Sequence, residues 1–388
     1  MKAVWTSAIA LLLAVVLGAQ ENGVAADKIL VGQACALSGP AASLGQGMQA
    51  GLQAAFAEIN AKGGVGGRKI ELLSVNDGYE PNVSEIATKK LIEKDKVFAL
   101  IGAVGTPTAK VAIPIATAAN VPFIGAFTGA ELLRTPFNKN VVNIRASYYQ
   151  EMEKQAQVLV DARGLKKIAC FYQDDAFGQA GLAGIKLALE RRKMELVATG
   201  TFARNTTAVK PGLVDVMKGA PDAIVMVGPY KPCAEFIKLA TAEASLKSTV
   251  FTNISFVGTE ALVEALKGVN GDFLVTQVVP FPWDAANPLV ASYHAAMKTA
   301  GHDKQIGFIS LEGYVVGRVF AAALAKVEGA PTRAALIAEL EKFTALEIDG
   351  LKLAFGAEDH QGLDEVFLTT IRDGKVLPFA ADGKTTAK

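Results

Sequence analysis

Two kinds of apolar segment alternate along the chain from Lys28 onward. Short runs, such as residues 28–36, 97–101 and 122–125, are apolar at nearly every position. Longer segments, such as residues 46–60, carry apolar side chains three or four positions apart. The short runs are typical of strands buried on both faces of a sheet, and the longer segments are typical of amphipathic helices. Their alternation predicts an α/β fold built on parallel sheets that helices cover on both faces.

The alternation restarts after residues 139–147 (KNVVNIRAS). A helix is expected at residues 151–163, and further strand and helix patterns follow as far as Leu266. Because open sheets rarely grow large enough to hold both series, the restart predicts two Rossmann-like lobes instead of one sheet. The strand and helix patterns after Asp272 are expected to return to the first lobe, and the chain is expected to end in a β-hairpin.

These breaks in the pattern divide the chain between the two lobes. The chain is expected to cross from one lobe to the other three times, near Arg145, residues 276–280 and residues 346–350. The expected first lobe comprises residues 27–145 and 278–346, and the expected second lobe comprises residues 146–277 and 347–388.

The first 26 residues are expected to be an export signal. Lys2 precedes an apolar run at residues 8–18, and Val24 and Ala26 are small residues just before Asp27. A basic start, an apolar stretch of roughly ten to fifteen residues and small residues at positions −3 and −1 are typical of a secretory signal peptide. The run is shorter than the roughly twenty residues of a membrane span, although an uncleaved N-terminal anchor is the alternative. We therefore expect an exported, soluble protein whose mature chain begins near Asp27.

Charge and cysteine content exclude several functions. The formal net charge is +1 and no stripe of lysine or arginine is present, so a nucleic-acid partner is not expected. The three cysteines are widely spaced and odd in number, which predicts neither a disulfide framework nor a Cys-x-x-Cys metal site. We expect a monomer without metal or other cofactor.

Two of the apolar runs end in similar turns. Residues 97–110 (VFALIGAVGTPTAK) and 121–133 (VPFIGAFTGAELL) each pass from apolar residues into glycine and threonine and then into a helix. Ligands of doubly wound sheets bind beyond the carboxyl ends of the strands, where the free N–H groups of a helix N-terminus favour anions. Thr106 and Thr128 add hydroxyl groups there. The pair of turns suits one carboxylate, since no Gly-Lys-Ser/Thr phosphate loop is present; the alternative is that both threonines are only helix caps.

Few residues in the chain can assemble a catalytic site. The histidines are isolated, and no Gly-x-Ser-x-Gly elbow is present. Asp174 and Asp175 are adjacent, so they are either a carboxylate pair or helix caps. Glu312 is either a buried counter-charge or a carboxylate that offsets a helix dipole. Because no nucleophile and base come together, we expect a binding protein and no enzyme.

Several segments of the chain, in their order, resemble the periplasmic substrate-binding proteins of branched-chain amino-acid ABC transporters. The resemblance implies the type I periplasmic binding fold, an α/β fold with two Rossmann-like lobes joined by a three-strand hinge that close on a ligand. It also implies a membrane ABC permease as the partner that receives the ligand. The segments are SGPAASLGQGMQAGLQAAFAEINAKGGVGGRKIELL, LIEKDKVFALIGAVGTPTAKVAIPIA, NVPFIGAFTGAELL, QDDAFGQAGLAGIK and HQGLDEVFLT.

The resemblance assigns several residues to the ligand site. Thr106 in one turn, and Ala126 and Thr128 in the other, match the carboxylate-binding turns of the family. Leu44 stands where leucine-type binders carry an aromatic residue. Ser255 stands where they carry a glutamate that takes the ligand's ammonium group. The last two differences put an α-amino acid ligand in doubt.

The class of ligand is therefore open between two alternatives. A buried ammonium group without an anionic partner costs several kcal/mol, so an amino acid would need Asp174, Asp175 or Glu312 in place of Ser255. An apolar or aromatic carboxylate needs no such partner, and we expect it to bind at least as well as the matching amino acid. Arg145 is either a second partner of the ligand carboxylate or part of a hinge ion pair. A ligand-sensing receptor and a periplasmic α/β enzyme are the alternative functions. The apolar residues expected around the ligand are Leu44, Tyr148, Phe177 and Tyr230.

Overall fold

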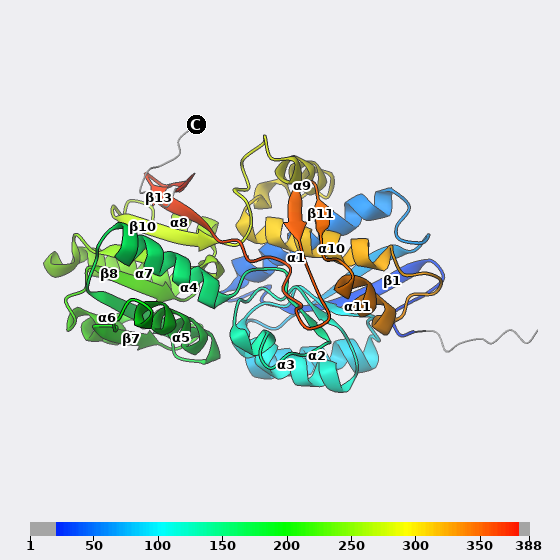
Figure 1. Ribbon diagram of the computed structural model, residues 1–388, viewed down its shortest axis with the longest axis horizontal. Helices are drawn as coiled ribbons and strands as arrows, with labels where there is room; N and C mark the ends of the chain where they lie inside the picture. The colour runs from blue at the N-terminus through cyan, green and yellow to red at the C-terminus, as the bar shows by residue number, and fades with distance from the viewer. Residues whose placement is uncertain (1–20, 380–388) are drawn as a thin grey trace, which may run out of the picture.

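The computed structural model describes residues 21–379 and consists of two α/β lobes side by side (Figure 1). The first lobe contains a five-stranded sheet in the order β2-β1-β3-β4-β5, and all its strands are parallel. β3 and β4 are only two residues long, so the turns that follow them begin deep in the lobe. The strands are β1 (Lys28–Cys35), β2 (Lys69–Asn76), β3 (Leu100–Ile101), β4 (Phe123–Ile124) and β5 (Val141–Val142).

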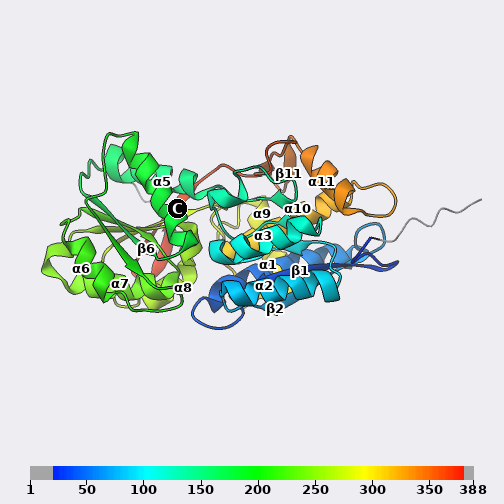
Figure 2. The same cartoon turned by 90° about the horizontal axis from the view of Figure 1, so that it is seen from below.

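Helices cover both faces of the first sheet, as Figures 1 and 2 show. One layer contains α1, α9 and α10, and the other contains α2 and α3. α1 and α10 pack closely because glycines lie at their contact: a Cβ on Gly51 would lie 2.0 Å from the carbonyl oxygen of Ser310. The helices of this lobe are α1 (Ala42–Ala61), α2 (Pro81–Lys89), α3 (Thr106–Ala118), α9 (Pro288–Thr299), α10 (Phe308–Leu324) and α11 (Arg333–Glu341).

The second lobe is built on a seven-stranded sheet in the order β14-β13-β10-β9-β8-β6-β7. Its first five strands in the sequence are parallel, and β13 and β14 form the antiparallel ending that the sequence predicts. The strands are β6 (Ile168–Gln173), β7 (Ala198–Phe202), β8 (Ala223–Val227), β9 (Val250–Asn253), β10 (Asp272–Gln277), β13 (Phe367–Arg372) and β14 (Lys375–Pro378).

The helices of the second lobe pack against one another in two groups, α4 on α5 and α7 on α6 and α8. They are α4 (Tyr148–Ala156), α5 (Ala176–Glu190), α6 (Lys210–Met217), α7 (Tyr230–Ala242) and α8 (Thr259–Ala265). Across residues 21–379, no helix combines the length and the apolar character that crossing a membrane requires.

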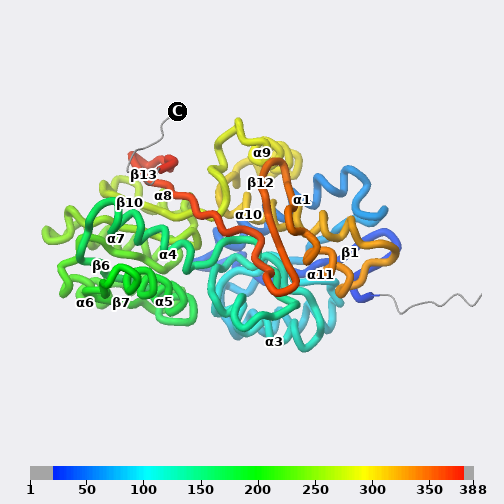
Figure 3. Tube along the Cα trace, viewed as in Figure 1, coloured from blue at the N-terminus to red at the C-terminus, as the bar shows by residue number. Residues whose placement is uncertain are grey.

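The chain passes from the first lobe to the second between β5 and α4, and returns between β10 and α9. The third passage differs from the crossing expected at residues 346–350. There the chain forms a hairpin of β11 (Leu346–Ile348) and β12 (Leu351–Leu353), which Figure 3 shows beside α10. Farther on, the backbone of Asn143 still bonds that of His360 and Gly362. These bonds keep residues 347–361 with the first lobe, so the expected boundary is too early and the chain crosses just before β13.

Residues 21–26 also belong to the first lobe. Val24 is buried and forms a β-bridge with Ile29, and the carbonyl of Ala25 accepts a hydrogen bond from the side chain of Arg68 (2.9 Å). Residues 1–20 of the expected signal lie outside the described residues. A mature chain that begins near Asp27 would lack this hydrogen-bonded segment, and the position of cleavage stays a prediction.

Candidate functional site: the interlobe cleft

The two Gly/Thr turns lie side by side at the carboxyl end of the first sheet. The bridge between Val104 and Phe127 continues the β3–β4 pairing into the turns. The hydroxyl oxygens of Thr106 and Thr128 are 2.7 Å apart, and both side chains are fully buried. Gly105, in the left-handed region with φ of 103°, is the N-cap of α3, so Thr106 is the first helical residue and does not cap the helix. The alternative that Thr106 is only a helix cap is therefore wrong, because its hydroxyl group does not cap α3.

Tyr148 adds a third hydroxyl group to this pair. Its oxygen lies 3.2 Å from the hydroxyl oxygen of Thr128, and its backbone N–H donates to the carbonyl of Gly129. Burial raises the pKa of Tyr148 to about 12, so the phenol keeps its proton at neutral pH. We call Thr106, Thr128 and Tyr148 the hydroxyl cluster. Each of its members can donate a hydrogen bond to an anionic oxygen.

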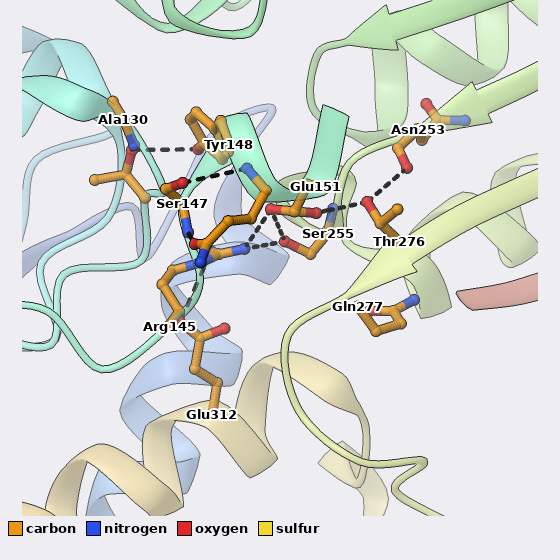
Figure 4. A network of polar contacts seen from close by, with 12 residues as sticks. Ala130, Arg145, Ser147, Tyr148, Glu151, Asn253, Ser255, Thr276, Gln277 and Glu312 are labelled. Carbon is orange, nitrogen blue, oxygen red and sulfur yellow. Dashed lines mark hydrogen bonds and ion pairs between the residues drawn. The ribbon is translucent and has the colours of Figure 1, made fainter. Parts of the chain in front are cut away.

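Arg145 lies next to the hydroxyl cluster and is 1% exposed. Its guanidinium carbon is 4.8 Å from the centre of the Phe127 ring and 5.9 Å from that of Tyr148. Its Nη2 donates to Glu151 (3.2 Å) and to the hydroxyl of Ser255, as Figure 4 shows. Its Nη1 lies 3.7 Å from a carboxylate oxygen of Glu312. Within residues 21–379, Nε and Nη1 of this buried guanidinium have no hydrogen-bond acceptor.

Glu151 is the carboxylate that pairs with the guanidinium of Arg145. Its carboxylate accepts from the backbone N–H of Ser255 (2.8 Å), from the Ser255 hydroxyl (2.9 Å) and from Thr276 (2.6 Å). Ser255 therefore binds the protein's own ion pair. We call Arg145, Glu151, Ser255 and Glu312 the hinge cluster. Sequence reasoning missed Glu151, whose only signal is its place in the first turn of the helix after Arg145.

Glu312 approaches the hinge cluster from α10, 3.7 Å from Nη1 of Arg145. It is almost completely buried, and burial raises the pKa of its carboxyl to about 7, opposed by Arg145 and reinforced by Glu151. The carboxyl therefore changes its charge near neutral pH. Of the three acids considered for a ligand ammonium, this is the one that lies beside Arg145.

Asp174 and Asp175 have other positions. Asp174 is exposed. Asp175 caps α5 by accepting from the N–H of Phe177 (2.9 Å), and its other oxygen accepts from Gln173 (2.7 Å) and Arg204 (3.1 Å). Both oxygens of Asp175 are thus occupied by neighbours outside the hinge cluster.

Four aromatic rings from both lobes meet in the cleft. Phe256, on the short turn after β9, stacks on Phe127 of the first lobe with ring centres 5.2 Å apart. Its ring is also 4.4 Å from that of Phe177 and 6.0 Å from that of Tyr79. We call these four residues the aromatic cluster; all are essentially unexposed. Sequence reasoning missed Phe127 and Phe256, although each stands directly beside an expected site residue, Thr128 or Ser255.

Leu44 and Tyr230 meet at a neighbouring part of the cleft. The Ser43 hydroxyl donates a hydrogen bond to the Tyr230 hydroxyl (3.2 Å), and this bond joins the lobes. A Cβ on Gly258 would lie 2.7 Å from Leu44 and 3.6 Å from Tyr230, so both side chains pack against that turn. Ala126 is buried in the second turn, where its carbonyl accepts from the N–H of Thr128.

A second set of charged contacts joins the lobes at the edge of the cleft. Glu80, at the start of α2, pairs with Arg204 of the second lobe (2.9 Å). Asn205 donates to the carboxylate of Glu80 (2.7 Å) and to the carbonyl of Gly78 (3.1 Å). We call Glu80, Asp175, Arg204 and Asn205 the rim cluster. These contacts join the two lobes at this edge.

The side chains that the structure describes do not form a metal site. Among residues 21–379, no three histidine, cysteine, aspartate or glutamate side chains are placed to hold a metal ion. Cys35, Cys170 and Cys233 are all buried. The arrangement in the cleft instead offers hydroxyl groups, one guanidinium and aromatic rings, which is a set suited to binding an anion that carries an apolar group.

Comparisons with known proteins agree with this architecture. A family model described as periplasmic binding protein matches residues 28–375. A Leu/Ile/Val-binding protein homolog of Brucella abortus is 26% identical over 365 residues, which are 89% of this chain and 88% of that protein.

Solved structures are similar over nearly the whole chain. A possible leucine/isoleucine/valine-binding protein from Rhodopirellula baltica is 36% identical with a TM-score of 0.86, over 94% of this chain and 99% of that one. An ABC transporter solute-binding protein from R. palustris in complex with benzoate is 21% identical with a TM-score of 0.79, over 93% and 98% of the two chains. The chain belongs to the periplasmic binding protein family, and its relatives are of the Leu/Ile/Val-binding type.

Proposed function

We propose that the protein is the exported solute-binding component of an ABC importer and captures a small apolar or aromatic carboxylate between its lobes. The observation that carries this proposal is Arg145, a fully buried guanidinium with two nitrogens that find no acceptor among residues 21–379. A buried charge without its full set of hydrogen bonds is costly. A ligand carboxylate beside Arg145 and the hydroxyl cluster would supply the missing acceptors.

The aromatic cluster favours an apolar group on the same ligand. Phe127 and Tyr148 flank the guanidinium, so an acid bound there would place its apolar part against rings. Burial of a ring of 150–250 Å² at about 25 cal/mol per Å² gives about 4–6 kcal/mol before the costs of association. The structurally similar R. palustris protein is in complex with benzoate, an acid of this kind.

A hydrophobic amino acid is the second candidate, because Glu312 offers a carboxyl group beside Arg145. The two candidates affect its proton in opposite directions. A ligand carboxylate near Glu312 raises the pKa of this carboxyl, whereas a ligand ammonium lowers it. The pKa of Glu312 is raised to about 7 in the free protein. Near pH 7, Glu312 should therefore take up protons when an acid binds and release them when an amino acid binds.

The test is a titration of the matched pair 3-phenylpropanoate and phenylalanine, with benzoate as a third ligand. Calorimetry near pH 7 in two buffers of different ionisation enthalpy gives both the affinity and the number of protons exchanged. We expect the acid to bind at least as tightly as the amino acid and to take up protons, and we expect Glu312→Gln to abolish the exchange. If phenylalanine binds more tightly than the acid by more than about 3 kcal/mol and its binding releases protons, the proposed ligand is an amino acid and not an acid.

Delivery to a permease follows from closure of the lobes. The ligand would enter while the lobes are apart and be enclosed when the rim cluster forms. We propose that the lobes turn about the three crossings, the third of them just before β13. A receptor of the same fold that passes the closed state to a signalling partner would use the same cleft. Uptake of the ligand by cells with and without the gene separates the two roles.

A further inference from the structure

Phe256 belongs to the second lobe, and its ring packs against two rings of the first lobe within the aromatic cluster. Its ring stacks on Phe127 with an interplanar angle of 30° and also approaches Tyr79, and both of these belong to the first lobe. Phe177 of its own lobe lies on another side, 4.4 Å away. The ring is fully buried. It therefore takes up apolar space between the lobes, next to the rings that flank Arg145.

The turn that carries Phe256 is fixed at one end. Ser255, the preceding residue, donates two hydrogen bonds to Glu151 and accepts one from Arg145. Gly258 follows the turn in the left-handed region with φ of 78°. Because Ser255 bonds Glu151 and Arg145, the backbone of Phe256 cannot withdraw without breaking these bonds. Its position relative to Arg145 is set by the turn.

We infer that Phe256 determines the size of the ligand that the cleft accepts. With the carboxylate at Arg145 and the hydroxyl cluster, the apolar part of the ligand extends among Phe127, Phe177 and the ring of Phe256. Phe256 limits how far it can extend. This inference rests on the proposed function for the position of the carboxylate, but it concerns the other end of the ligand. Replacing Phe256 by alanine should open space for one additional ring.

The test compares wild type, Phe256→Ala and a matched control, Phe171→Ala. Phe171 is also a fully buried phenylalanine, but it stacks on Phe202 and Phe236 inside the second lobe, with ring centres 5.0 and 4.0 Å away. Both variants lose the same atoms from a packed aromatic group. The probes are benzoate and biphenyl-4-carboxylate, which differ by one ring, and the two corresponding primary amides. Calorimetry measures the association constants, and thermal unfolding checks that each variant folds.

We expect the preference for biphenyl-4-carboxylate over benzoate to rise at least tenfold in Phe256→Ala, and to stay within about twofold of wild type in Phe171→Ala. A gain of biphenyl-4-carboxylate binding by Phe256→Ala alone, when wild type binds neither acid, would also support the inference. An unchanged preference in Phe256→Ala would overturn it, although binding of either acid by wild type would leave the proposed function standing.

The amides separate the two proposals when no acid binds. If Phe256→Ala prefers the longer amide and Phe171→Ala does not, the role of Phe256 holds and the carboxylate site fails. If Phe256→Ala binds neither acids nor amides, the inference about Phe256 is wrong.

Discussion

The hinge cluster and the rim cluster both join the lobes through ion pairs, but their surroundings differ. Arg145 and Glu151 are 1% and 0% exposed, whereas Arg204 and Glu80 are 24% and 39% exposed. Water and salt screen the pair at the rim, so it contributes about 0–1 kcal/mol. The hinge pair is enclosed, and removal of one partner leaves a buried charge, which costs about 3–5 kcal/mol. The rim is therefore suited to repeated opening, and the hinge cluster to holding a fixed site.

The two clusters also differ in how completely their donors are used. At the rim, Arg204 donates to both Glu80 and Asp175. In the hinge cluster, Arg145 binds Glu151 and Ser255 through Nη2, but its Nε and Nη1 have no acceptor in the part of the chain that the structure describes. The proposed ligand carboxylate would complete the pairing in the buried cluster, where incomplete pairing is costly.

Glu151→Gln should have the largest effect. The substitution keeps the shape of the side chain but removes the charge that faces Arg145, so the free energy of unfolding should fall by about 3–5 kcal/mol. Urea denaturation measures this change. Glu80→Gln, at the rim, is the control and should change the same quantity by less than about 1 kcal/mol. Equal effects at the two sites would contradict the distinction between the clusters.

The stability of the protein should depend on pH through Glu312. Its pKa is raised to about 7 in the folded protein from the 4.5 of an ordinary glutamate, so the folded state binds the proton more tightly than the unfolded chain does. The free energy of unfolding should therefore fall as pH rises from about 4.5 to 7, by about 3 kcal/mol.

Urea denaturation across this pH range measures the decline in wild type and in Glu312→Gln, where it should be smaller. Asp77→Asn is the comparison, because burial also raises the pKa of Asp77, to about 6. The decline in the free energy of unfolding that Asp77 contributes, and that Asp77→Asn removes, should end at a lower pH than the decline from Glu312. A pH profile of Glu312→Gln identical to that of wild type would show that Glu312 does not titrate as proposed.

Thr128→Ala and Thr106→Ala should weaken ligand binding without unfolding the protein. If each hydroxyl donates to a charged oxygen, its loss should reduce the binding free energy by about 1.5–3 kcal/mol. Calorimetry with the acid that binds wild type best measures this change, and the melting temperature serves as the control. A lower melting temperature with unchanged affinity would mean that the two hydroxyls only support the turns.

Arg204→Gln should have the smallest effect. It removes a partly exposed pair at the rim, so affinity should fall by at most about 1 kcal/mol, and less at high salt because the charges are screened. The measurement is the affinity of wild type and variant at low and high ionic strength. A loss greater than that of Thr128→Ala would place the rim, and not the hinge cluster, at the centre of binding.

Most of the fold was predictable because it depends on local patterns. Strands such as β6 and β8 are apolar along their length, and helices such as α1 show apolar residues at helical spacing. The crossing at residues 346–350 was wrong for the opposite reason. The sequence of β12 reads as a strand, but nothing local shows that it pairs with β11 and not with the second sheet.

The site was predictable only where its residues follow strands. Thr106 and Thr128 stand in the turns that follow β3 and β4, and neighbouring parallel strands bring such turns together at one edge of a sheet. Glu151, Phe127 and Phe256 carry no comparable signal. Glu151 resembles any glutamate in the first turn of a helix, and the two phenylalanines resemble core residues.

The sequence by itself determined the α/β class, the presence of two lobes and the pairing of the two Gly/Thr turns. Each of these follows from hydrophobic periodicity or from residues close to one strand end. Only the tertiary structure decided that Ser255 binds Glu151 and Arg145, that Glu312 is buried beside them, and that Phe256 stacks on Phe127. These contacts join residues more than a hundred positions apart, and those of Arg145 with Ser255 and of Phe256 with Phe127 cross from one lobe to the other. Charge, burial and ring stacking depend on what closes over a side chain, and this is fixed only when the lobes meet.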